Sequence, residues 1–431
     1  MSLSSRDLQV IWHPYTQMQL TEEPIAIVKG EGVYLTDENG KKYIDAVSSW
    51  WVNIHGHSHP YIAEKVSEQL RKLEHVIFAG FTHEAAVELA ERLLRILPPN
   101  QSKIFYSDNG STAVEVAVKM AIQYWHNQGK KKNKIIAFEH SYHGDTFGAM
   151  SISARGAFTQ PFSSLLFDTI HIPFPSKGKE DQTISDIKTE ILKNKSEIAA
   201  FIFEPLVLGA GGMRMYEAAV LDELIKICKD NEILIIADEV MTGFGRTGKL
   251  FASEYLMQQP DIMCLSKGIT GGTMALGVTS CKEEIYNAFL SNDRAKTFFH
   301  GHSYTANPVA CSAAIASLEL LLTEDCQNNI FRISQQHRSF AEKICGMTSI
   351  KNVRSTGTIL AFDFETSDKT SYFNSIRDEL YNFFLGEGII LRPLGNTLYV
   401  MPPYCISDKD LQYIYQTIEK RAGLFESGSD V

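Results

Sequence analysis

Two apolar runs that end in chemically reactive side chains constrain most strongly how this chain can fold. Residues 233–237 are uninterrupted aliphatic residues that stop at Asp238, and residues 262–265 are followed by a serine and then Lys267. Short apolar runs that alternate with helical patterns indicate strands of a parallel sheet that is buried on both faces. Ligands of such sheets bind at the carboxyl ends of the strands, so both side chains are predicted to lie at a binding site.

Strand candidates alternate with helical patterns through the middle of the chain. Strands are expected at residues 103–107, 134–139, 199–204, 234–238, 262–266 and 276–280, with helices at 113–125 and 218–231. This alternation predicts an α/β fold with a mostly parallel central sheet that is covered by helices on both faces.

The pattern changes after about Pro308. A long helix is expected at 309–323, followed by strands at 359–364 and 397–401 and helices at 373–385 and 408–422. A chain of 431 residues is also longer than one small core usually absorbs. We therefore predict a large domain at 51–308 and a smaller α/β domain built from 1–50 and 309–431.

Composition narrows the class of protein. The net charge of −10 argues against a nucleic acid or an anionic membrane as partner. No apolar run approaches the ~20 residues that span a bilayer, and the first ten residues contain no apolar signal core. Seven scattered cysteines without a CxxC spacing indicate reduced thiols, so a cytoplasmic protein is expected.

Asp238 and Lys267 together indicate a particular cofactor. A buried carboxylate can keep a heterocycle protonated, and a lysine can form a Schiff base with an aldehyde. This combination is the protein's contribution to pyridoxal-phosphate chemistry. The pair does not determine which substrate bond is broken, so a mutase or a decarboxylase stays possible on these residues alone.

A glycine-containing turn at residues 109–112 lies between a strand and an amphipathic helix. Gly110 permits a close turn, and either Ser111 or Thr112 is expected to cap the helix, whose free N–H groups can bind an anion. An ordinary capped turn explains the same residues equally well.

Residues 243–248 match the dinucleotide fingerprint GxGxxG, but we reject a nucleotide site there. Asp238 and Glu239 at the strand exit would repel a pyrophosphate, and the first glycine does not follow the strand directly. We interpret the segment as a glycine-shaped loop of the active site, and NAD binding remains the most remote alternative.

Histidines cluster at residues 55–59 and 300–302. A zinc site is the alternative to hydrogen-bonding loop histidines, but no cysteine or acid has ligand spacing near either cluster. We therefore predict no metal site.

Several aromatic and charged residues have both a functional and a structural explanation. Tyr142 can stack on a planar cofactor or pack under a loop. Of the adjacent Trp50 and Trp51, at least one is expected to line a pocket or an interface, because neighbours cannot both face one core. Arg392 interrupts an apolar, strand-like stretch and requires an anion, either a structural carboxylate or that of a substrate.

Taken together, these motifs resemble the class III, fold type I pyridoxal-phosphate aminotransferases over essentially the whole chain. The resemblance depends on Gly110-Ser111-Thr112, Tyr142-His143-Gly144, Asp238-Glu239-Val240 with Gly243-Phe244-Gly245-Arg246, and Ser266-Lys267-Gly268, in the family's order. Four further segments are similar to members that act in biotin synthesis, namely Trp12-His13-Pro14-Tyr15-Thr16, Ser49-Trp50-Trp51, His300-Gly301-His302-Ser303, and Leu391-Arg392-Pro393 with Met401-Pro402-Pro403-Tyr404.

The resemblance implies a role for each matching residue. Lys267 would attach the cofactor and move a proton, Asp238 would pair with the ring nitrogen, and Tyr142 would stack on the ring. The implied cofactor-binding residues are Gly110, Ser111, Tyr142, Asp238, Val240, Lys267, His302 and Ser303. The implied substrate-binding residues are Tyr15, Trp50, Trp51, Tyr142, Asp145, Gly301 and Arg392.

The resemblance also implies substrates and a partner. S-adenosylmethionine would donate an amino group to 8-amino-7-oxononanoate, whose carboxylate Arg392 would bind. A homodimer is implied, because residues 301–303 reach the partner's site in this family. Another class III ω-aminotransferase is the nearest rival, and the double tryptophan and Arg392 argue against it. Lysine as the amino donor stays open.

Overall fold

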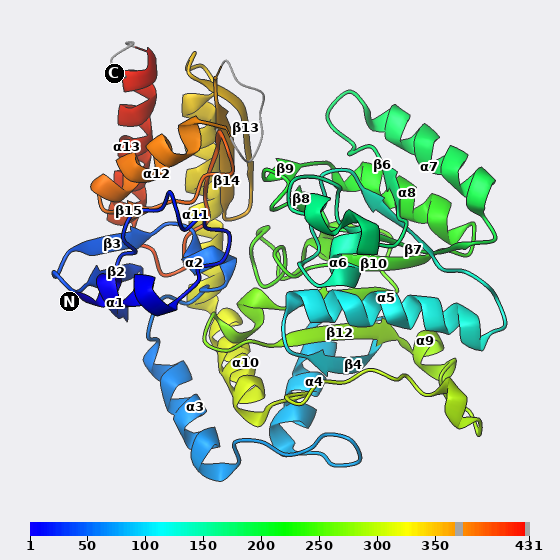
Figure 1. Cartoon of the computed structure of the whole chain (residues 1–431). Coiled ribbons are helices and arrows are strands. Elements are labelled where there is room, and N and C mark those ends of the chain that lie inside the picture. The colour runs from blue at the N-terminus through cyan, green and yellow to red at the C-terminus, as the bar shows by residue number, and fades with distance from the viewer. Residues whose placement is uncertain (367–373, 427–431) are drawn as a thin grey trace.

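A seven-stranded sheet forms the centre of the protein in the computed structural model, which describes residues 1–366 and 374–426 (Figure 1). The strands lie in the order β4 (Gln101–Ser107), β12 (Gly277–Lys282), β11 (Ile262–Leu265), β10 (Leu234–Asp238), β7 (Ile198–Phe203), β5 (Lys134–Phe138) and β6 (Ile170–Ile172). β12 runs antiparallel to both β11 and β4, whereas β11, β10, β7, β5 and β6 pair in parallel. The prediction of a mostly parallel central sheet is confirmed. The sequence did not indicate β6, which is too short to produce a pattern.

Side chains of the central strands alternate between two helical layers. In β10, Leu234 and Ile236 pack in the core beneath α5, whereas Ile235 and Ala237 belong to the core on the opposite face. Burial on both faces explains why these strands are continuously apolar in the sequence. The surrounding helices and the small hairpin are α4 (Glu84–Ile96), α5 (Gly110–Asn127), α6 (Phe147–Ile152), α7 (Glu180–Asn194), β8 (Val207–Leu208), β9 (Arg214–Met215), α8 (Ala218–Lys229), α9 (Glu283–Asn287) and α10 (Pro308–Leu321).

The C-terminal part of the chain forms a second, antiparallel sheet of described strands in the order β13-β14-β16. Its middle strand β14 is buried along its whole length, because helices and loops cover both of its faces. The elements are α11 (Glu324–Ile344), β13 (Ile350–Thr356), β14 (Ile359–Phe364), α12 (Ile376–Gly386), β16 (Thr397–Val400) and α13 (Asp408–Glu426). The helix predicted at 373–385 is α12, and position 373 itself lies outside the described residues.

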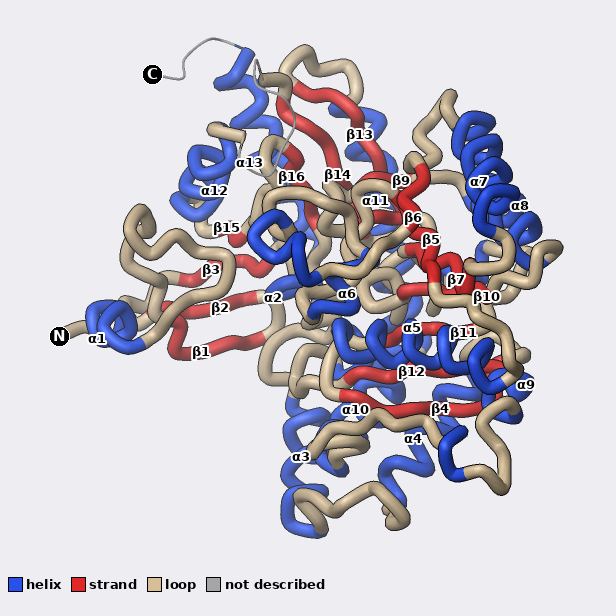
Figure 2. Tube along the Cα trace, turned by 45° about the vertical axis from the view of Figure 1, so that its right-hand side comes forward, coloured by secondary structure: helices blue, strands red, loops and turns tan. Residues whose placement is uncertain are grey.

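N-terminal and C-terminal segments meet in a third sheet (Figure 2). β15 (Ile389–Ile390) pairs in parallel with β3, which brings residue 390 beside Asp45. The other elements of the N-terminal part are α1 (Leu3–Val10), β1 (Ile27–Glu31), β2 (Tyr34–Asp37), β3 (Lys42–Asp45), α2 (Ser48–Trp51) and α3 (Pro60–Lys72). The division of the chain at residues 50 and 309 stays a prediction, and α10 packs against α3 and α4 across that boundary. None of the described helices is both long and apolar enough to cross a membrane.

The turn between β13 and β14 is pressed against the loop at residues 246–248. Gly357 in this turn has φ +55, and an added Cβ would lie 2.2 Å from the carbonyl carbon of Thr247 and 2.3 Å from the nitrogen of Gly248. Both atoms are backbone, so neither can move aside as a flexible side chain would. We predict that Gly357→Ala lowers the free energy of unfolding by about 2 kcal/mol or more, measured as a lower midpoint of thermal unfolding.

Gly346 provides the matched control, because an added Cβ there meets no atom within 4 Å. Gly346→Ala should change the free energy of unfolding by no more than about 0.5 kcal/mol. Equal unfolding midpoints for the two variants would contradict the close packing at Gly357.

Candidate active site

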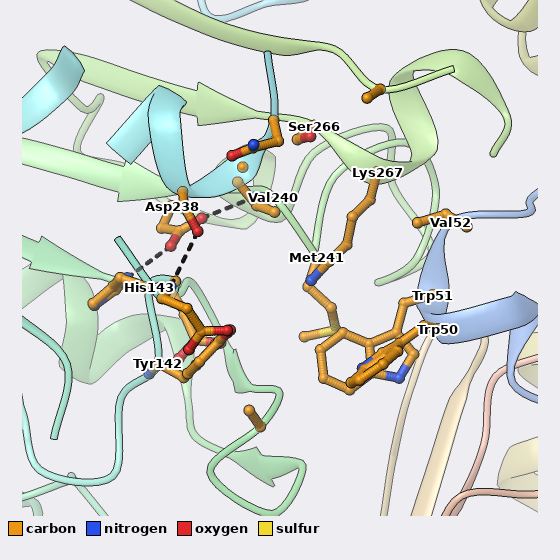
Figure 3. A pocket seen from close by; sticks show the side chains of 18 of the residues that line it. Trp50, Trp51, Val52, Tyr142, His143, Asp238, Val240, Met241, Ser266 and Lys267 are labelled. Carbon is orange, nitrogen blue, oxygen red and sulfur yellow. Dashed lines mark hydrogen bonds and ion pairs between the residues drawn. The ribbon is translucent and has the colours of Figure 1, made fainter. Parts of the chain in front are cut away.

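A cavity of about 760 Å³ lies at the carboxyl ends of β10 and β11 (Figure 3). Asp238 ends β10 and Lys267 lies two residues after β11, so both of these side chains reach the cavity, as their positions in the sequence predicted. The predicted site residues that line it are Tyr15, Trp50, Trp51, Gly110, Ser111, Tyr142, Asp145, Asp238, Val240, Lys267 and Arg392. Gly301, His302 and Ser303 do not line it.

Asp238 is a buried carboxylate with two hydrogen-bond partners. Nδ1 of His143 donates to its Oδ2 at 2.7 Å, and the backbone N–H of Val240 donates to its Oδ1 at 3.1 Å. His143 is itself buried. No role was predicted for His143 from the sequence, although it lies beside Tyr142 in the segment Tyr142-His143-Gly144.

Glu204 is a second buried acid in the cavity wall that the sequence analysis did not assign to the site. It follows β7 directly and accepts hydrogen bonds from the backbone N–H groups of Tyr142 (3.0 Å) and Gly209 (2.9 Å). Burial raises its pKa to about 7, and the negative charge of Asp238 acts in the same direction. An acid at the end of a predicted buried strand, followed by proline, was the signal that could have identified it.

Lys267 begins a short 3₁₀ turn with a left-handed backbone, at φ 48°. Its Nζ lies 4.4 Å from the centre of the Trp51 ring. Removal from water lowers the pKa of Lys267 to about 8, and the charge of Arg246 acts in the same direction, whereas Asp238 and Glu204 oppose the shift. A lowered pKa increases the fraction of neutral, nucleophilic amine near neutral pH.

The N-terminus of α5 opens onto the cavity. Asn109 caps this helix by accepting from the backbone N–H of Thr112 at 3.0 Å, and Thr112 Oγ1 accepts from the backbone N–H of Asn109 at 2.9 Å. The N-cap is therefore Asn109, which has the extended backbone and the short side chain that this position needs, and of the two predicted residues Thr112 contributes the reciprocal hydrogen bond of the capping box. Gly110 and Ser111 line the cavity at the positive end of the helix, and Ser111 Oγ accepts from the backbone N–H of Asp145 at 3.2 Å.

A hydrogen-bonded cluster of two tyrosines and an aspartate lies on another wall of the cavity. The Tyr142 hydroxyl donates to Oδ2 of Asp145 at 2.9 Å, and the Tyr15 hydroxyl donates to the same oxygen. Burial raises the pKa of Tyr142, and its hydrogen bond with Tyr15 acts in the same direction. Tyr142 therefore stays a neutral donor, and the two hydroxyls fix the position of the Asp145 carboxylate.

Arg392 lies in a loop after β15, whereas the sequence suggested a strand. Its guanidinium carbon is 4.3 Å from the centre of the Trp50 ring. Within the described part of the chain no carboxylate forms a salt bridge with it, and its guanidinium lines the cavity. Trp51 donates its indole N–H to the Tyr399 hydroxyl at 3.0 Å. Both Trp50 and Trp51 line the cavity.

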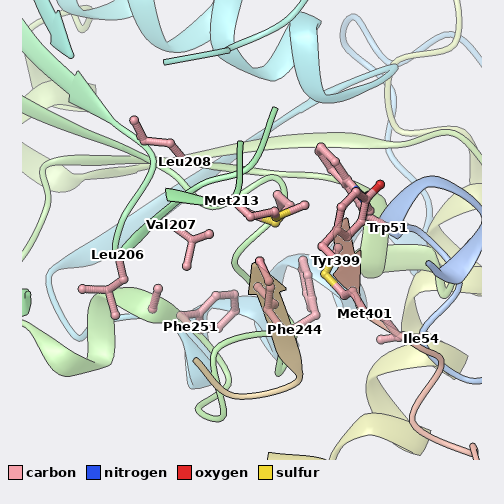
Figure 4. Packing of buried hydrophobic residues seen from close by; sticks show 14 of the residues in the cluster. Trp51, Ile54, Leu206, Val207, Leu208, Met213, Phe244, Phe251, Tyr399 and Met401 are labelled. Carbon is pink, nitrogen blue, oxygen red and sulfur yellow. The ribbon is translucent and has the colours of Figure 1, made fainter. Parts of the chain in front are cut away.

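The segment at residues 243–248 does not line the cavity, so its interpretation as an active-site loop was wrong. Residues 243–247 are buried, and Phe244 packs against Phe251 (Figure 4). The buried Arg246 donates to the backbone carbonyl of Trp51 at 3.2 Å and to that of Pro402 at 3.0 Å. The glycines allow this close packing. The segment affects the cavity indirectly, because Arg246 fixes the backbone of Trp51, which lines the cavity.

The predicted loop residues 301–303 lie along α5, outside the cavity of their own chain. His302 and His300 share a hydrogen bond of 3.0 Å between their Nε2 atoms, and Lys119 on α5 contacts Nδ1 of His300 at 3.0 Å. Ser303 and Gly301 are exposed. In the region that the structure describes, no group of three histidine, cysteine or acidic side chains is arranged to hold a metal ion.

This combination of an α/β sheet, a strand-end acid, a lysine of lowered pKa and an open helix N-terminus defines a cofactor-dependent enzyme that uses a lysine amine. The model of the family described as "Aminotransferase class-III" matches residues 15–421. The chain is 46% identical to the adenosylmethionine-8-amino-7-oxononanoate aminotransferase of Synechococcus elongatus, over 95% of this chain and 97% of the relative. It is 38% identical to the protein of the same name from Staphylococcus aureus, over 97% and 96%.

Solved structures agree with these relatives. The adenosylmethionine-8-amino-7-oxononanoate aminotransferase of Methanocaldococcus jannaschii superposes with a TM-score of 0.91 at 36% identity, over 97% of this chain and 98% of the other. An omega transaminase from Pseudomonas jessenii in complex with PMP has a TM-score of 0.92 at 27% identity, over 98% and 97%. The chain belongs to the class-III aminotransferase family and is a pyridoxal-phosphate-dependent aminotransferase.

The residues of the cavity fit pyridoxal phosphate. The α5 N-terminus offers N–H groups for a phosphate, and a Cβ on Gly110 would lie 2.7 Å from Val240, so only glycine leaves this space open. Asp238 offers a buried carboxylate for the pyridine nitrogen, and Lys267 offers the amine for the aldehyde. All four residues line one cavity.

The lowered pKa of Lys267 predicts how cofactor binding depends on pH. We expect the rate at which apoenzyme recovers its visible absorbance with pyridoxal phosphate to rise about tenfold per pH unit and to level off near pH 8. Glu204→Gln removes a negative charge that raises the pKa of Lys267, so the midpoint should move to lower pH. Glu139→Gln, at an exposed site, is the control. A midpoint near 10 in the wild type would contradict this environment for Lys267.

Proposed function

We propose that this aminotransferase transfers an amino group from S-adenosylmethionine to 8-amino-7-oxononanoate and forms 7,8-diaminononanoate, a step of biotin biosynthesis. The placement of Arg392 over Trp50 carries the proposal, because a guanidinium beside an apolar wall fits a carboxylate at the end of an aliphatic chain. The names of the relatives from Synechococcus elongatus and Methanocaldococcus jannaschii support the same substrates.

Five residues would hold the cofactor without a covalent bond. Pyridoxal phosphate, when bound, supplies a carbonyl carbon that takes up the amino group of the donor and returns it to the acceptor. Gly110 and Ser111 would bind the phosphate with helix N–H groups, and Asp238 would keep a proton on the ring nitrogen. Tyr142 and Val240 would pack against the ring.

Lys267 is the residue that forms the covalent link and moves the proton. Its Nζ is the only lysine amine that lines the cavity of the described chain, and its lowered pKa lets it accept a proton from the substrate carbon and release it again. His143 acts on Asp238, because its hydrogen bond to Oδ2 orients the carboxylate and stabilises its charge.

The acceptor and the donor use the wall opposite the helix. Arg392 binds the acceptor carboxylate, and Trp50 and Trp51 pack along its aliphatic chain and exclude water. Tyr15 and Asp145 contact the donor and then the acceptor. The hydrogen bonds that the Tyr15 and Tyr142 hydroxyls donate to Asp145 hold these groups in place before a substrate binds.

We further propose a homodimer in which Gly301, His302 and Ser303 of one copy complete the site of the other. These residues lie outside their own cavity, and the nearby Phe299 and Tyr304 are 70% and 64% exposed, which is unusual for large aromatic side chains unless a partner covers them. A cytoplasmic location is supported by the free cysteines among the described residues, four of which are buried thiols.

Single-turnover spectra test the proposed substrates. Holoenzyme mixed with S-adenosylmethionine, but not with glutamate, should lose its visible absorbance, and 8-amino-7-oxononanoate should then restore it. Bleaching by lysine without bleaching by S-adenosylmethionine would refute the proposed donor. Failure of the oxo acid to restore the band would refute the proposed acceptor.

Arg392→Ala should impair the two half-reactions unequally. Loss of the charge-assisted contact is expected to reduce the rate with limiting oxo acid about 100-fold, which corresponds to about 3 kcal/mol, and to change the donor half-reaction far less. The exposed Arg294, which lies outside the cavity, gives the control variant Arg294→Ala. An equal loss in both half-reactions would contradict Arg392 as the carboxylate receptor.

A further inference from the structure

The segment that carries both cavity tryptophans has an unusual backbone. Ser48, Ser49, Trp50 and Trp51 form α2 with φ values of 50°, 45°, 71° and 75°, and the ψ values of the two central residues are 55° and 44°. The turn is therefore left-handed. Residues other than glycine avoid this region because Cβ crowds the following carbonyl, so four in succession persist only where surrounding contacts impose the conformation.

The carboxylate of Asp45, at the end of β3, binds the start of this turn. Its Oδ1 accepts from the backbone N–H of Ser49 at 2.9 Å and from that of Val47 at 3.3 Å, and its Oδ2 accepts from the Ser49 hydroxyl at 2.7 Å. Asp45 is fully buried. Burial opposes its ionisation, but the hydrogen bonds from His57 and Ser49 outweigh that effect and hold the pKa of Asp45 below its ordinary value.

His57 is a further hydrogen-bond partner of the Asp45 carboxylate. Its Nε2 lies 3.0 Å from Asp45 Oδ2, and its Nδ1 lies 2.9 Å from the Asn53 side-chain amide nitrogen. Because that amide donates to Nδ1, the proton of a neutral ring is on Nε2 and points at Asp45. His57 is itself fixed by two backbone hydrogen bonds with Gly32.

The left-handed turn determines where two indole rings lie. Trp50 contacts Arg392, and its ring centre is 5.6 Å from that of Tyr15. Trp51 contacts the Lys267 amine. In Figure 3 both rings extend from α2 toward the end of the Lys267 side chain. A right-handed backbone at residues 48–51 would move both rings away from these partners.

We propose that Asp45 and His57 are positioning residues for acceptor specificity, which hold α2 in its left-handed form so that Trp50 lies beside Arg392. The inference rests on the proposed function, in which Trp50 contacts the aliphatic chain of the oxo acid. Neither Asp45 nor His57 lines the cavity, so both act through the turn.

Glycine substitution at residue 49 gives a specific test. Asp45→Asn replaces a carboxylate oxygen with an amide N–H at the place where His57 also donates. The variant loses one hydrogen bond to a charged acceptor. It should therefore raise KM for 8-amino-7-oxononanoate about tenfold, with a smaller change in kcat. Adding Ser49→Gly should lower KM most of the way back to the wild-type value, because glycine adopts φ 45° without strain. Adding Ser49→Ala is the matched control, since it removes the same hydroxyl and keeps the Cβ.

Hydrogen exchange of the holoenzyme, followed in a peptide that covers residues 46–53, gives a readout that does not depend on substrate. Asp45→Asn should speed exchange there. His57→Leu, with the same additions at residue 49, replaces Asp45→Asn if that variant does not fold. Equal rescue by Gly and Ala, or unchanged KM and exchange in the variants, would overturn the proposal. A wild type that rejects the oxo acid while the variants exchange faster would refute the proposed function and leave α2 positioning supported.

Discussion

The buried hydrogen bond between His143 and Asp238 is the interaction on which the rest of the site depends. A carboxylate at the end of a fully apolar strand loses its hydration, and only specific partners can keep it charged. His143 and the N–H of Val240 are those partners. Because the parallel strands end at one edge of the sheet, Asp238 lies close enough to Glu204 and Lys267 to raise the pKa of both groups. The cofactor chemistry of the family needs both a stable negative charge and a neutral amine, and this edge of the sheet provides both.

The proposed recognition of substrate depends on a different part of the fold. Arg392 and Trp50 come from segments more than three hundred residues apart, which are joined because β15 pairs with β3. The left-handed turn of α2 then determines the position of Trp50 and Trp51, and Arg246 donates a hydrogen bond to the backbone carbonyl of Trp51. The proposed cofactor-binding residues thus lie at the edge of the central sheet, and the proposed substrate-binding residues lie where the N-terminal and C-terminal segments meet.

The sequence predicted the parts that follow from strand periodicity. Asp238 and Lys267 were placed at the site because continuous apolar runs stop at them, and β10 and β14 lie at the predicted residues. His143 and Glu204 were missed as site residues because their role depends on which strand ends are neighbours, which is a property of sheet order. The GxGxxG segment was assigned to the cavity because glycine spacing indicates close packing without saying what is packed. No local sequence pattern predicted the left-handed backbone of α2, because hydrogen bonds to Asp45 impose this conformation on serine and tryptophan residues.

The protonation state of the cofactor's ring nitrogen tests the central role of Asp238 most directly. Holoenzyme reconstituted with pyridoxal phosphate labelled with ¹⁵N in the ring can be examined by NMR, in the wild type and in Asp238→Asn. A protonated nitrogen in the wild type and an unprotonated one in the variant is the predicted result, because only a carboxylate offers the charge that holds the proton. The same nitrogen shift in both proteins would contradict Asp238 as the group that keeps the ring protonated.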